Sequence, residues 1–99
     1  MRADDYITKP FNSEELSVDG EAVKLTPTEY KIMDFLMTNA GIVFSAEKIY
    51  ENVWEQPAYS VENTVMVHIR RIREKIEINP KDPKYLKVVW GIGYKIEKI

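Results

Sequence analysis

Four basic side chains gather between positions 70 and 75 of this chain: Arg70, Arg71, Arg73 and Lys75. An arginine can donate two hydrogen bonds to O6 and N7 of guanine, a contact that discriminates against the wrong base by ~1–3 kcal/mol. Lysine and arginine side chains also attract the phosphate backbone. The cluster therefore predicts binding to double-stranded DNA, although a solvated helix face without a ligand would have a similar composition.

A helix predicted over residues 61–77 positions this cluster. At 100° per residue, five branched apolar residues fall within ~40° of one line: Val61, Val65, Ile69, Ile72 and Ile76. The opposite side carries the basic residues together with Val67, whose methyl groups suit contact with a thymine methyl. Asn63 and Thr64, near the helix start, can donate to phosphate with help from the helix dipole. A helix of ~17 residues is ~25 Å long and fits the major groove.

Two further helices are expected upstream. The segment Thr26-Pro27-Thr28-Glu29 is a capping box with proline in the first helical position, and it predicts a helix that ends at Gly41. Ser45 is predicted to cap a second helix, which ends at Trp54. Between these helices, residues 42–44 are β-branched and aromatic, so we expect a short strand there.

Two β-hairpins complete the expected fold. Asp19-Gly20 lies between two alternating segments and predicts a tight hairpin. Near the end of the chain, Gly91-Ile92-Gly93 connects two strand-like segments and permits a second reversal. The order is hairpin, helix, strand, helix, loop, helix and hairpin. We therefore predict an α+β winged helix-turn-helix, with three helices, an N-terminal β-hairpin and a C-terminal hairpin as the wing.

The distribution of charge supports a nucleic-acid partner better than the total does. The net charge is −2. Residues 1–62 hold 5 Lys/Arg and 12 Asp/Glu, whereas residues 63–99 hold 9 Lys/Arg and 4 Asp/Glu. A basic surface at one end is what attraction to phosphate requires.

Composition argues against several other classes of protein. A chain of 99 residues makes one small domain, and the absence of cysteine excludes disulfides and thiolate metal sites. There is no run of ~20 apolar residues and no apolar signal region, so we expect a cytoplasmic protein without a membrane partner. Ser45, His68 and Asp34 fall on separate predicted helices, and no glycine-rich phosphate loop or metal-ligand spacing is present. We therefore predict no enzymatic activity, no cofactor and no metal.

Three segments occur in a characteristic order: Leu25-Thr26-Pro27-Thr28-Glu29-Tyr30, the stretch from Thr64 to Ile76, and Val89-Trp90-Gly91-Ile92-Gly93-Tyr94. Together they resemble the OmpR/PhoB family of response-regulator effector domains, over residues 15–99. The Val-His-Ile-Arg-Arg stretch and the Gly-x-Gly-Tyr ending are most similar to regulators of the vancomycin-resistance (VanR) type. The resemblance implies a two-component transcriptional regulator.

The resemblance also implies roles for individual residues. The third helix would lie in the major groove and the wing over the adjacent minor groove. The groove-facing residues would be Thr64, Val67, His68 and Arg71, and the contacts to the DNA backbone would come from Arg70 and Arg73. Lys75 would flank them as a further phosphate partner. Trp54 and Tyr94 match positions that contact phosphate, although core packing is an equal alternative for Trp54.

Two positions depart from the family pattern. Many members carry arginine where this chain has Trp90, and that arginine enters the minor groove. Trp90 cannot supply the charge, which puts minor-groove contact by the wing in doubt and leaves packing as an alternative role. Asn63 also replaces a frequent arginine. Both changes predict weaker electrostatic binding than in a typical member.

Residues 1–14 resemble a different structure. Ala3-Asp4-Asp5-Tyr6-Ile7-Thr8-Lys9-Pro10-Phe11 is similar to the last strand and loop of a receiver domain, in which the lysine that matches Lys9 contacts a phosphoryl group. The phospho-accepting aspartate is absent, so we expect no receiver-type phosphorylation. We interpret residues 1–14 as a receiver remnant left by a deletion, with residues 1–12 mobile, and residues 15–99 as the effector domain.

The same interpretation leaves the N-terminal sheet without its first two strands and its edge exposed. Either residues 6–8 pair back onto the first hairpin, or the edge pairs between chains and makes a weak dimer. An alternative function is therefore that of a protein-interaction fragment without DNA binding. Otherwise the chain would bind one half-site of a direct repeat as a monomer. The loop from Glu55 to Ser60 either contacts RNA polymerase, as the resemblance implies, or only connects two helices.

Overall fold

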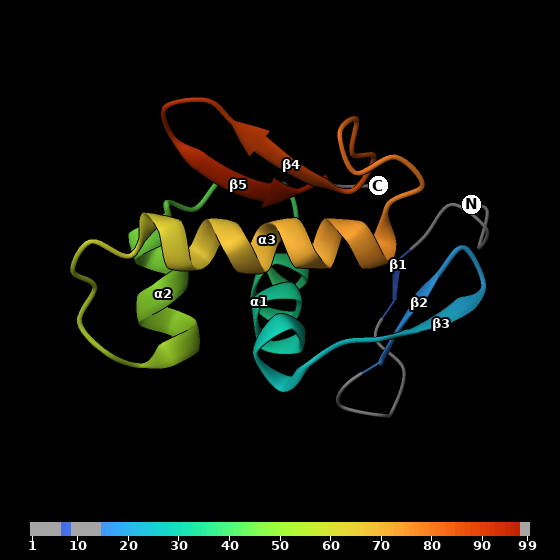
Figure 1. Ribbon diagram of the computed structural model, residues 1–99, viewed down its shortest axis with the longest axis horizontal. Helices are drawn as coiled ribbons and strands as arrows, with labels where there is room; N and C mark the ends of the chain where they lie inside the picture. Colours follow the sequence, from blue (N-terminus) through green and yellow to red (C-terminus); the bar gives the residue numbers. More distant parts are fainter. Residues whose placement is uncertain (1–6, 9–14, 98–99) are drawn as a thin grey trace.

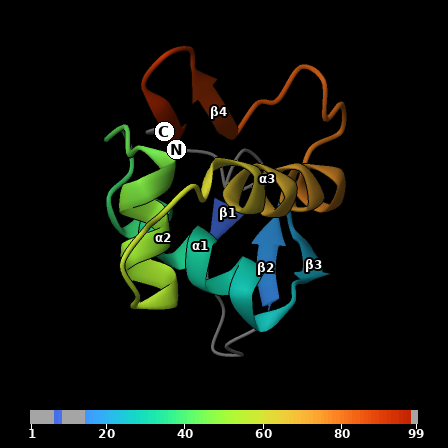
Figure 2. The ribbon, with the colours of Figure 1, turned by 60° about the vertical axis from the view of Figure 1, so that its left-hand side comes forward.

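The computed structural model describes residues 7–8 and 15–97 and contains three helices and two antiparallel sheets (Figure 1). The helices are α1 (Pro27–Thr38), α2 (Ala46–Trp54) and α3 (Glu62–Ile76). The strands are β1 (Ile7–Thr8), β2 (Glu15–Val18), β3 (Glu21–Lys24), β4 (Leu86–Val89) and β5 (Gly93–Ile96). Figures 1 and 2 show α3 between the β4–β5 hairpin and a layer made by α1, α2 and the N-terminal sheet.

Helices α1 and α2 begin at the predicted caps, whereas α1 ends at Thr38, before the predicted end at Gly41. At α1, the backbone N–H of Glu29 donates to Oγ1 of Thr26 (3.2 Å) and the N–H of Thr26 donates to Oε1 of Glu29 (3.0 Å), which confirms the capping box. At α2, the hydroxyl oxygen of Ser45 accepts from the N–H of Lys48 (3.1 Å). No side chain caps α3, which is one residue shorter at each end than the predicted 61–77.

The core lies beneath α3 and joins all the elements. The predicted stripe is confirmed, because every one of its members is buried: Val61, Val65, Ile69, Ile72 and Ile76. From the other side, α1 contributes Ile32, Met33 and Leu36, and α2 contributes Ile49 and Val53. Leu16, Leu86 and Ile96 bring the two sheets into the same cluster. The stripe therefore fixes which side of α3 faces outward. No helix in the described part of the chain is long and apolar enough to cross a membrane.

The N-terminal sheet has the strand order β1-β2-β3. Asp19 and Gly20 both have positive φ angles (50° and 87°), as the predicted tight hairpin turn requires. Ile7 pairs with Val18 and Thr8 with Ser17. These two residues therefore pair back onto the first hairpin, which was one of the two arrangements that the sequence left open.

The other residues of the receiver-like stretch, including Lys9, lie outside the described residues. The interpretation of residues 1–14 as a receiver remnant stays a prediction.

The prediction of a strand at residues 42–44 is wrong except at Phe44. Only Phe44 pairs, through reciprocal hydrogen bonds with the backbone of Tyr94 (both 2.9 Å). Upstream, the N–H of Ile42 donates to the carbonyl oxygen of Asn39 (3.0 Å) in the turn after α1, and downstream Ser45 begins the cap of α2, so the pairing extends in neither direction. Close approach at this point depends on Gly93, because a Cβ atom there would lie 2.0 Å from the carbonyl oxygen of Phe44.

Candidate nucleic-acid interface

Helix α3 presents a continuous exposed side to solvent. Opposite the buried stripe lie Asn63, Val67, Arg70 and Glu74, all exposed, and Arg71 is exposed beside them. Val67 is 36% exposed, which is unusual for a branched apolar residue on a packed helix. We call these five residues the outer face of α3. It combines an apolar contact point with two guanidinium groups, as a base-reading surface requires.

The margin of α3 toward α2 is held by an aromatic cluster. The indole of Trp54 stacks on Tyr50 (ring centroids 4.7 Å apart) and meets the His68 ring edge-on (5.2 Å, 83°). Nδ1 of His68 lies 2.8 Å from the carbonyl oxygen of Thr64. Because a carbonyl only accepts, Nδ1 carries the proton, and Nε2 of the neutral ring is an acceptor. Trp54 is half-buried in this cluster, so its packing role is present in the structure.

The margin toward α1 is held by an ion pair that includes Lys75. Its Nζ donates to Oε1 of Glu29 at 2.6 Å. Burial raises the pKa of the Glu29 carboxyl, but hydrogen bonds from Lys75 and from the backbone of Thr26 outweigh it, and the pKa is lowered overall. Glu29 is therefore ionised at neutral pH. The ammonium of Lys75, expected beside DNA phosphate, is engaged with a buried carboxylate.

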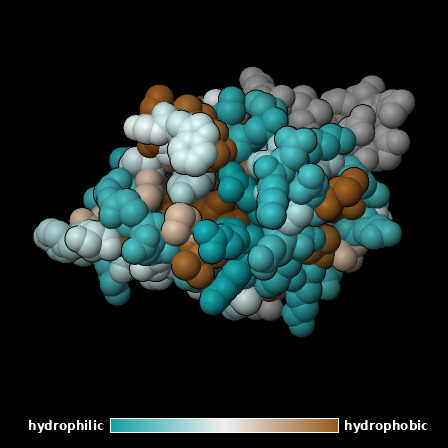
Figure 3. Space-filling model, turned by 45° about the horizontal axis from the view of Figure 1, so that its top comes forward, coloured by the Kyte–Doolittle hydropathy of each residue, from teal (hydrophilic) through white to brown (hydrophobic). Residues whose placement is uncertain are grey.

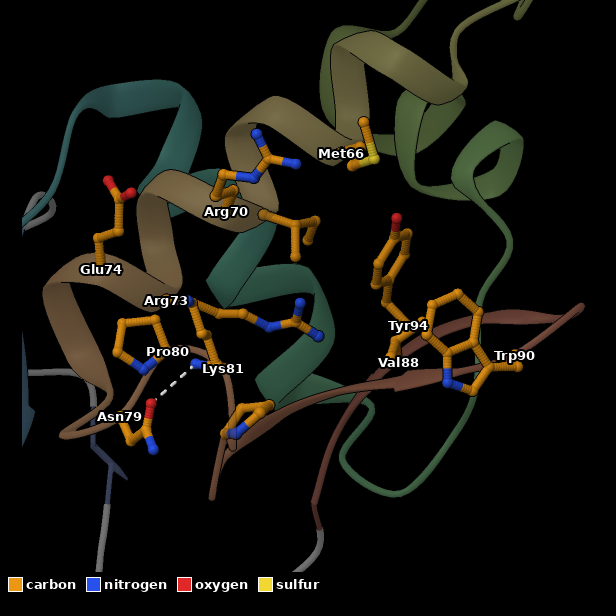
Figure 4. Close-up of a pocket in the computed structure, with 12 residues that line it drawn as sticks. Met66, Arg70, Arg73, Glu74, Asn79, Pro80, Lys81, Val88, Trp90 and Tyr94 are labelled. Carbon is orange, nitrogen blue, oxygen red and sulfur yellow. Dashed lines mark hydrogen bonds between the residues drawn. The ribbon is translucent and has the colours of Figure 1, made fainter.

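Arg73 lies on the margin of α3 toward the wing and points into the space between helix and hairpin (Figure 4). Its Nε donates to the carbonyl oxygen of Leu86 at 2.9 Å. Its Nη2 is buried without a hydrogen-bond partner in the described part of the protein. Burial lowers the pKa of Arg73, against opposing contributions from Tyr94 and Glu77. The structure thus makes Arg73 a link between α3 and β4, whereas the sequence placed it on the DNA backbone.

A groove of about 680 Å³ separates α3 from the β4–β5 hairpin. The helix side is lined by Met66, Ile69, Arg70, Arg73 and Glu74, and the hairpin side by Val88, Trp90 and Tyr94. Figure 4 shows the Tyr94 ring beneath Met66, next to Trp90, which is 87% exposed. Because Arg70 and Trp90 border the same groove, the outer face and the hairpin turn are presented on one side of the molecule.

Glu77 is a structural residue of this site that the sequence did not single out. It is buried, and its carboxylate accepts three backbone hydrogen bonds, from the N–H groups of Lys84 (2.7 Å), Tyr85 (3.0 Å) and Leu86 (2.8 Å). These bonds fix the start of β4 to the end of α3. The only signal in the sequence was an acidic residue at a helix end, which is too common to identify such a role.

The predicted DNA-contacting residues fall into three groups. Six are exposed on the side of α3 and the wing turn: Asn63, Thr64, Val67, Arg70, Arg71 and Trp90. Three are half-buried, namely Trp54, His68 and Tyr94, and two have charged groups engaged within the protein, namely Arg73 and Lys75. In the loop between α2 and α3, Tyr59 is 82% exposed.

Comparison with known proteins gives a family match. The profile described as "Transcriptional regulatory protein, C terminal" matches residues 20–96. The regulatory protein VanRc of Enterococcus gallinarum is 44% identical over 94 residues, which cover 95% of this chain and 41% of that protein. The transcriptional regulatory protein YvrH of Bacillus subtilis is 43% identical over 91 residues, covering 92% and 38%. The chain thus spans about two-fifths of the length of these relatives.

Solved structures show the same fold. The response regulator DrrB of Thermotoga maritima, an OmpR/PhoB homologue, superposes with a TM-score of 0.75 at 33% identity, over 91% of this chain and 44% of that one. The DNA-binding domain of RstA from Klebsiella pneumoniae, solved in complex with the RstA box, gives a TM-score of 0.77 at 25% identity, over 91% and 96%. These likenesses confirm the predicted winged helix-turn-helix, and the relatives are regulators and not enzymes. With most of its length matched by the profile, the chain belongs to the family of transcriptional regulatory protein C-terminal domains, as its resemblance to OmpR/PhoB response regulators predicted.

Proposed function

We propose that this domain binds double-stranded DNA in a sequence-specific manner, with α3 in the major groove, as the effector domain of a two-component response regulator. The observation that carries the proposal is the outer face of α3, where Val67, Arg70 and Arg71 are exposed above a fully buried stripe. A helix locked in this way presents its side chains in one fixed orientation. The structure of the RstA domain on its DNA box supports the same use of this fold.

Each exposed residue has a suitable partner on DNA. Arg71 can donate to O6 and N7 of guanine, and Val67 can contact a thymine methyl. Arg70 is free to contact phosphate, and Thr64 lies in the first turn of α3, where the helix dipole favours an anion. With Nδ1 donating to the carbonyl oxygen of Thr64, Nε2 of His68 is directed to the other side of the ring and can serve as a contact to a base edge.

Three residues are proposed as contacts with less exposure. Trp54 and Tyr94 would donate an indole N–H and a hydroxyl to phosphate from half-buried positions. Arg73 would contact phosphate only after its guanidinium leaves the position in which Nη2 is buried and Nε donates to Leu86. We assign Lys75 to the ion pair with Glu29, and we expect it to contribute little to DNA binding.

The proposal is tested by fluorescence anisotropy of a labelled duplex, chosen by selection from random sequences, at several salt concentrations. Arg71→Ala should cost ~1–3 kcal/mol on the selected sequence and little on random DNA, because it removes a base contact. Lys31→Ala is the matched control, since Lys31 is exposed on α1, away from α3, and its loss should change binding little. A folded protein that binds no duplex at low salt would refute the proposal.

Partners beyond one DNA half-site are part of the same proposal. In the loop from Glu55 to Ser60, both end residues have positive φ angles (57° and 53°), which gives the loop a defined shape, and Tyr59 offers an exposed anchor for RNA polymerase. A second candidate function is self-association through β3, which is an edge strand within the described residues. Light scattering at high concentration distinguishes the two, because DNA binding by a monomer needs no dimer.

A further inference from the structure

The turn between β4 and β5 exposes large apolar side chains. Trp90 is 87% exposed and Ile92 is 62% exposed, on either side of Gly91, whose φ is +79°. We call residues 90–92 the wing tip. Large exposed apolar residues that gather on one rigid turn are unusual in a monomeric domain and indicate a contact surface. In Figure 3, pale and brown atoms gather at the upper left, where the wing turn lies in Figure 1, while the middle of this face is mainly hydrophilic.

The wing tip has no charge with which to attract phosphate. Residues 88–94 contain no acidic or basic side chain. The cations nearest to the tip along the chain are Lys87 and Lys95, which are partners across the two strands, and both approach the carboxylate of Glu97 (3.9 Å and 3.2 Å). The positive charge at the base of the hairpin is thus partly neutralised within the wing. The tip can therefore offer apolar area, the aromatic ring and neutral N–H donors, but no charged group.

The wing tip lies where a second groove of DNA would be. Trp90 and the outer-face residues Arg70 and Glu74 border one groove of the protein (Figure 4), so a DNA duplex bound by the outer face would pass close to the wing tip. The phosphate backbone separates each major groove from the next minor groove. With α3 in the major groove, a hairpin beside it crosses that backbone and reaches the adjacent minor groove.

The tip is also held rigidly. Four residue pairs align β4 with β5, and Phe44 bonds to Tyr94 on the other edge of β5. A tryptophan has only two side-chain torsions, so ordering it on binding costs little conformational entropy.

We propose that the wing tip is an apolar wedge, in which Trp90 and Ile92 press into the minor groove beside the site read by α3. This inference rests on the DNA binding proposed above and adds a mode of sequence selection to it. Apolar wedges between base steps partly unstack them, which is easiest at pyrimidine–purine steps. The amino group of guanine projects into the minor groove and would obstruct the wedge. The wing would therefore favour flexible flanking steps without guanine.

The test measures anisotropy of the selected duplex against the wild type, Trp90→Ala and Trp90→Phe at several salt concentrations. Trp90→Ala should weaken binding about tenfold at every salt concentration, within the range of aromatic contacts to bases, and leave the salt slope unchanged. Trp90→Phe should retain most of the affinity. Ile78→Ala is the control, because Ile78 is 96% exposed just beyond the C-terminal end of α3, and its loss should have no effect.

A second readout locates the contact. Replacing deoxyguanosine by deoxyinosine in the flanking step removes the minor-groove amino group and leaves the major groove unchanged. This replacement should tighten binding of the wild type but not of Trp90→Ala. A 2-aminopurine placed at the flanking step should brighten on binding of the wild type only, because unstacking increases its emission.

The outcomes separate the wedge from the function on which it rests. Binding by Trp90→Ala within twofold of the wild type, while Arg71→Ala is impaired, would overturn the wedge and leave DNA reading by α3 intact. A change of about one unit in the salt slope of Trp90→Ala would instead show a contact to phosphate and overturn the apolar mode. A folded wild type that binds no duplex would overturn both. Since Trp90 is almost fully exposed, its variants should melt at the wild-type temperature.

Discussion

The two β-hairpins of this domain have similar lengths and opposite designs. The turn of the β2–β3 hairpin is tied to the body of the protein, because the hydroxyl of Tyr85 donates to Oδ1 of Asp19 at 2.6 Å. In the β4–β5 hairpin the fixed points lie in the strands: Glu77 holds the start of β4, and Phe44 bonds to Tyr94 of β5. Within the described residues, no hydrogen bond joins residues 90–92 to the body of the protein. One hairpin closes the core, and the other presents a tip. The difference shows that the function of a hairpin depends on which end the protein fixes.

Gly93→Ala should have the largest effect of these substitutions, because it detaches the β4–β5 hairpin from the body of the protein. A Cβ atom would lie 2.0 Å from the backbone oxygen of Phe44, so β5 must move away and both reciprocal hydrogen bonds with Tyr94 are lost. We expect a loss of about 3 kcal/mol in the free energy of unfolding. Gly91→Ala is the matched variant, because nothing lies within 4 Å of its Cβ position and only its φ of +79° opposes the change, at about 1 kcal/mol. Urea denaturation of both variants measures the difference, and equal losses would contradict this account.

Glu77→Gln should loosen the base of the wing. Glutamine has one acceptor oxygen and an amide group that cannot accept, so at least one of the backbone N–H groups of residues 84–86 loses its partner. We expect the free energy of unfolding to fall by about 2 kcal/mol. Hydrogen exchange should be faster at Lys84 or at Leu86, because these two N–H groups bond to different oxygens of the Glu77 carboxylate. Glu74→Gln, an exposed change one turn earlier in α3, should leave both measurements unchanged.

Asp19→Ala should have a smaller effect, confined to the tied turn. It removes the acceptor of the Tyr85 hydroxyl and places alanine at a φ of 50°. We expect the free energy of unfolding to fall by about 1.5 kcal/mol. Asp19→Asn keeps an acceptor and tolerates this φ, so its melting temperature should stay near that of the wild type. If DNA binding by Asp19→Ala fell as far as that of Trp90→Ala, the assignment of separate roles to the two hairpins would be wrong.

Glu29→Gln should give the smallest effect, and one that depends on pH. The folded-state pKa of Glu29 is lowered, so its ionised form stabilises the fold above the unfolded pKa of about 4.3, and that contribution is lost as the pH falls through the folded pKa. Because Lys75 is partly exposed, we expect the substitution to lower the free energy of unfolding by about 1 kcal/mol or less at neutral pH. Thermal unfolding at pH 7 and pH 3 measures it: the wild type should lose its advantage over the variant at the lower pH. The exposed Glu51→Gln is the control.

The local features of this fold could be predicted from the sequence. Thr26, Ser45 and the Asp19-Gly20 pair act through neighbours two or three residues away, and the stripe of α3 follows from helical spacing alone. The family motifs added the winged-helix arrangement. The exposed half of the candidate site followed from the same spacing, because residues opposite a buried stripe must face solvent.

Contacts between distant segments could not be predicted. Lys75 meets Glu29 across 46 positions, and Arg73 meets Leu86 across 13, so both basic residues looked identical to Arg70 and Arg71 in the sequence. The partner of a charged side chain depends on tertiary packing, which periodicity does not record. Phe44 was expected in a strand for its β propensity, but the cap of α2 limited it to one bridge.

The bonds of Glu77 and Arg73 to the first residues of the wing hold α3 and the wing tip at a fixed separation. The separation between a major groove and the next minor groove changes with local twist and with the narrowing of A-tracts. A duplex with the right bases but a different separation of the two grooves could contact either α3 or the wing tip, but not both. This domain would therefore be sensitive to DNA shape at positions where no side chain meets a base.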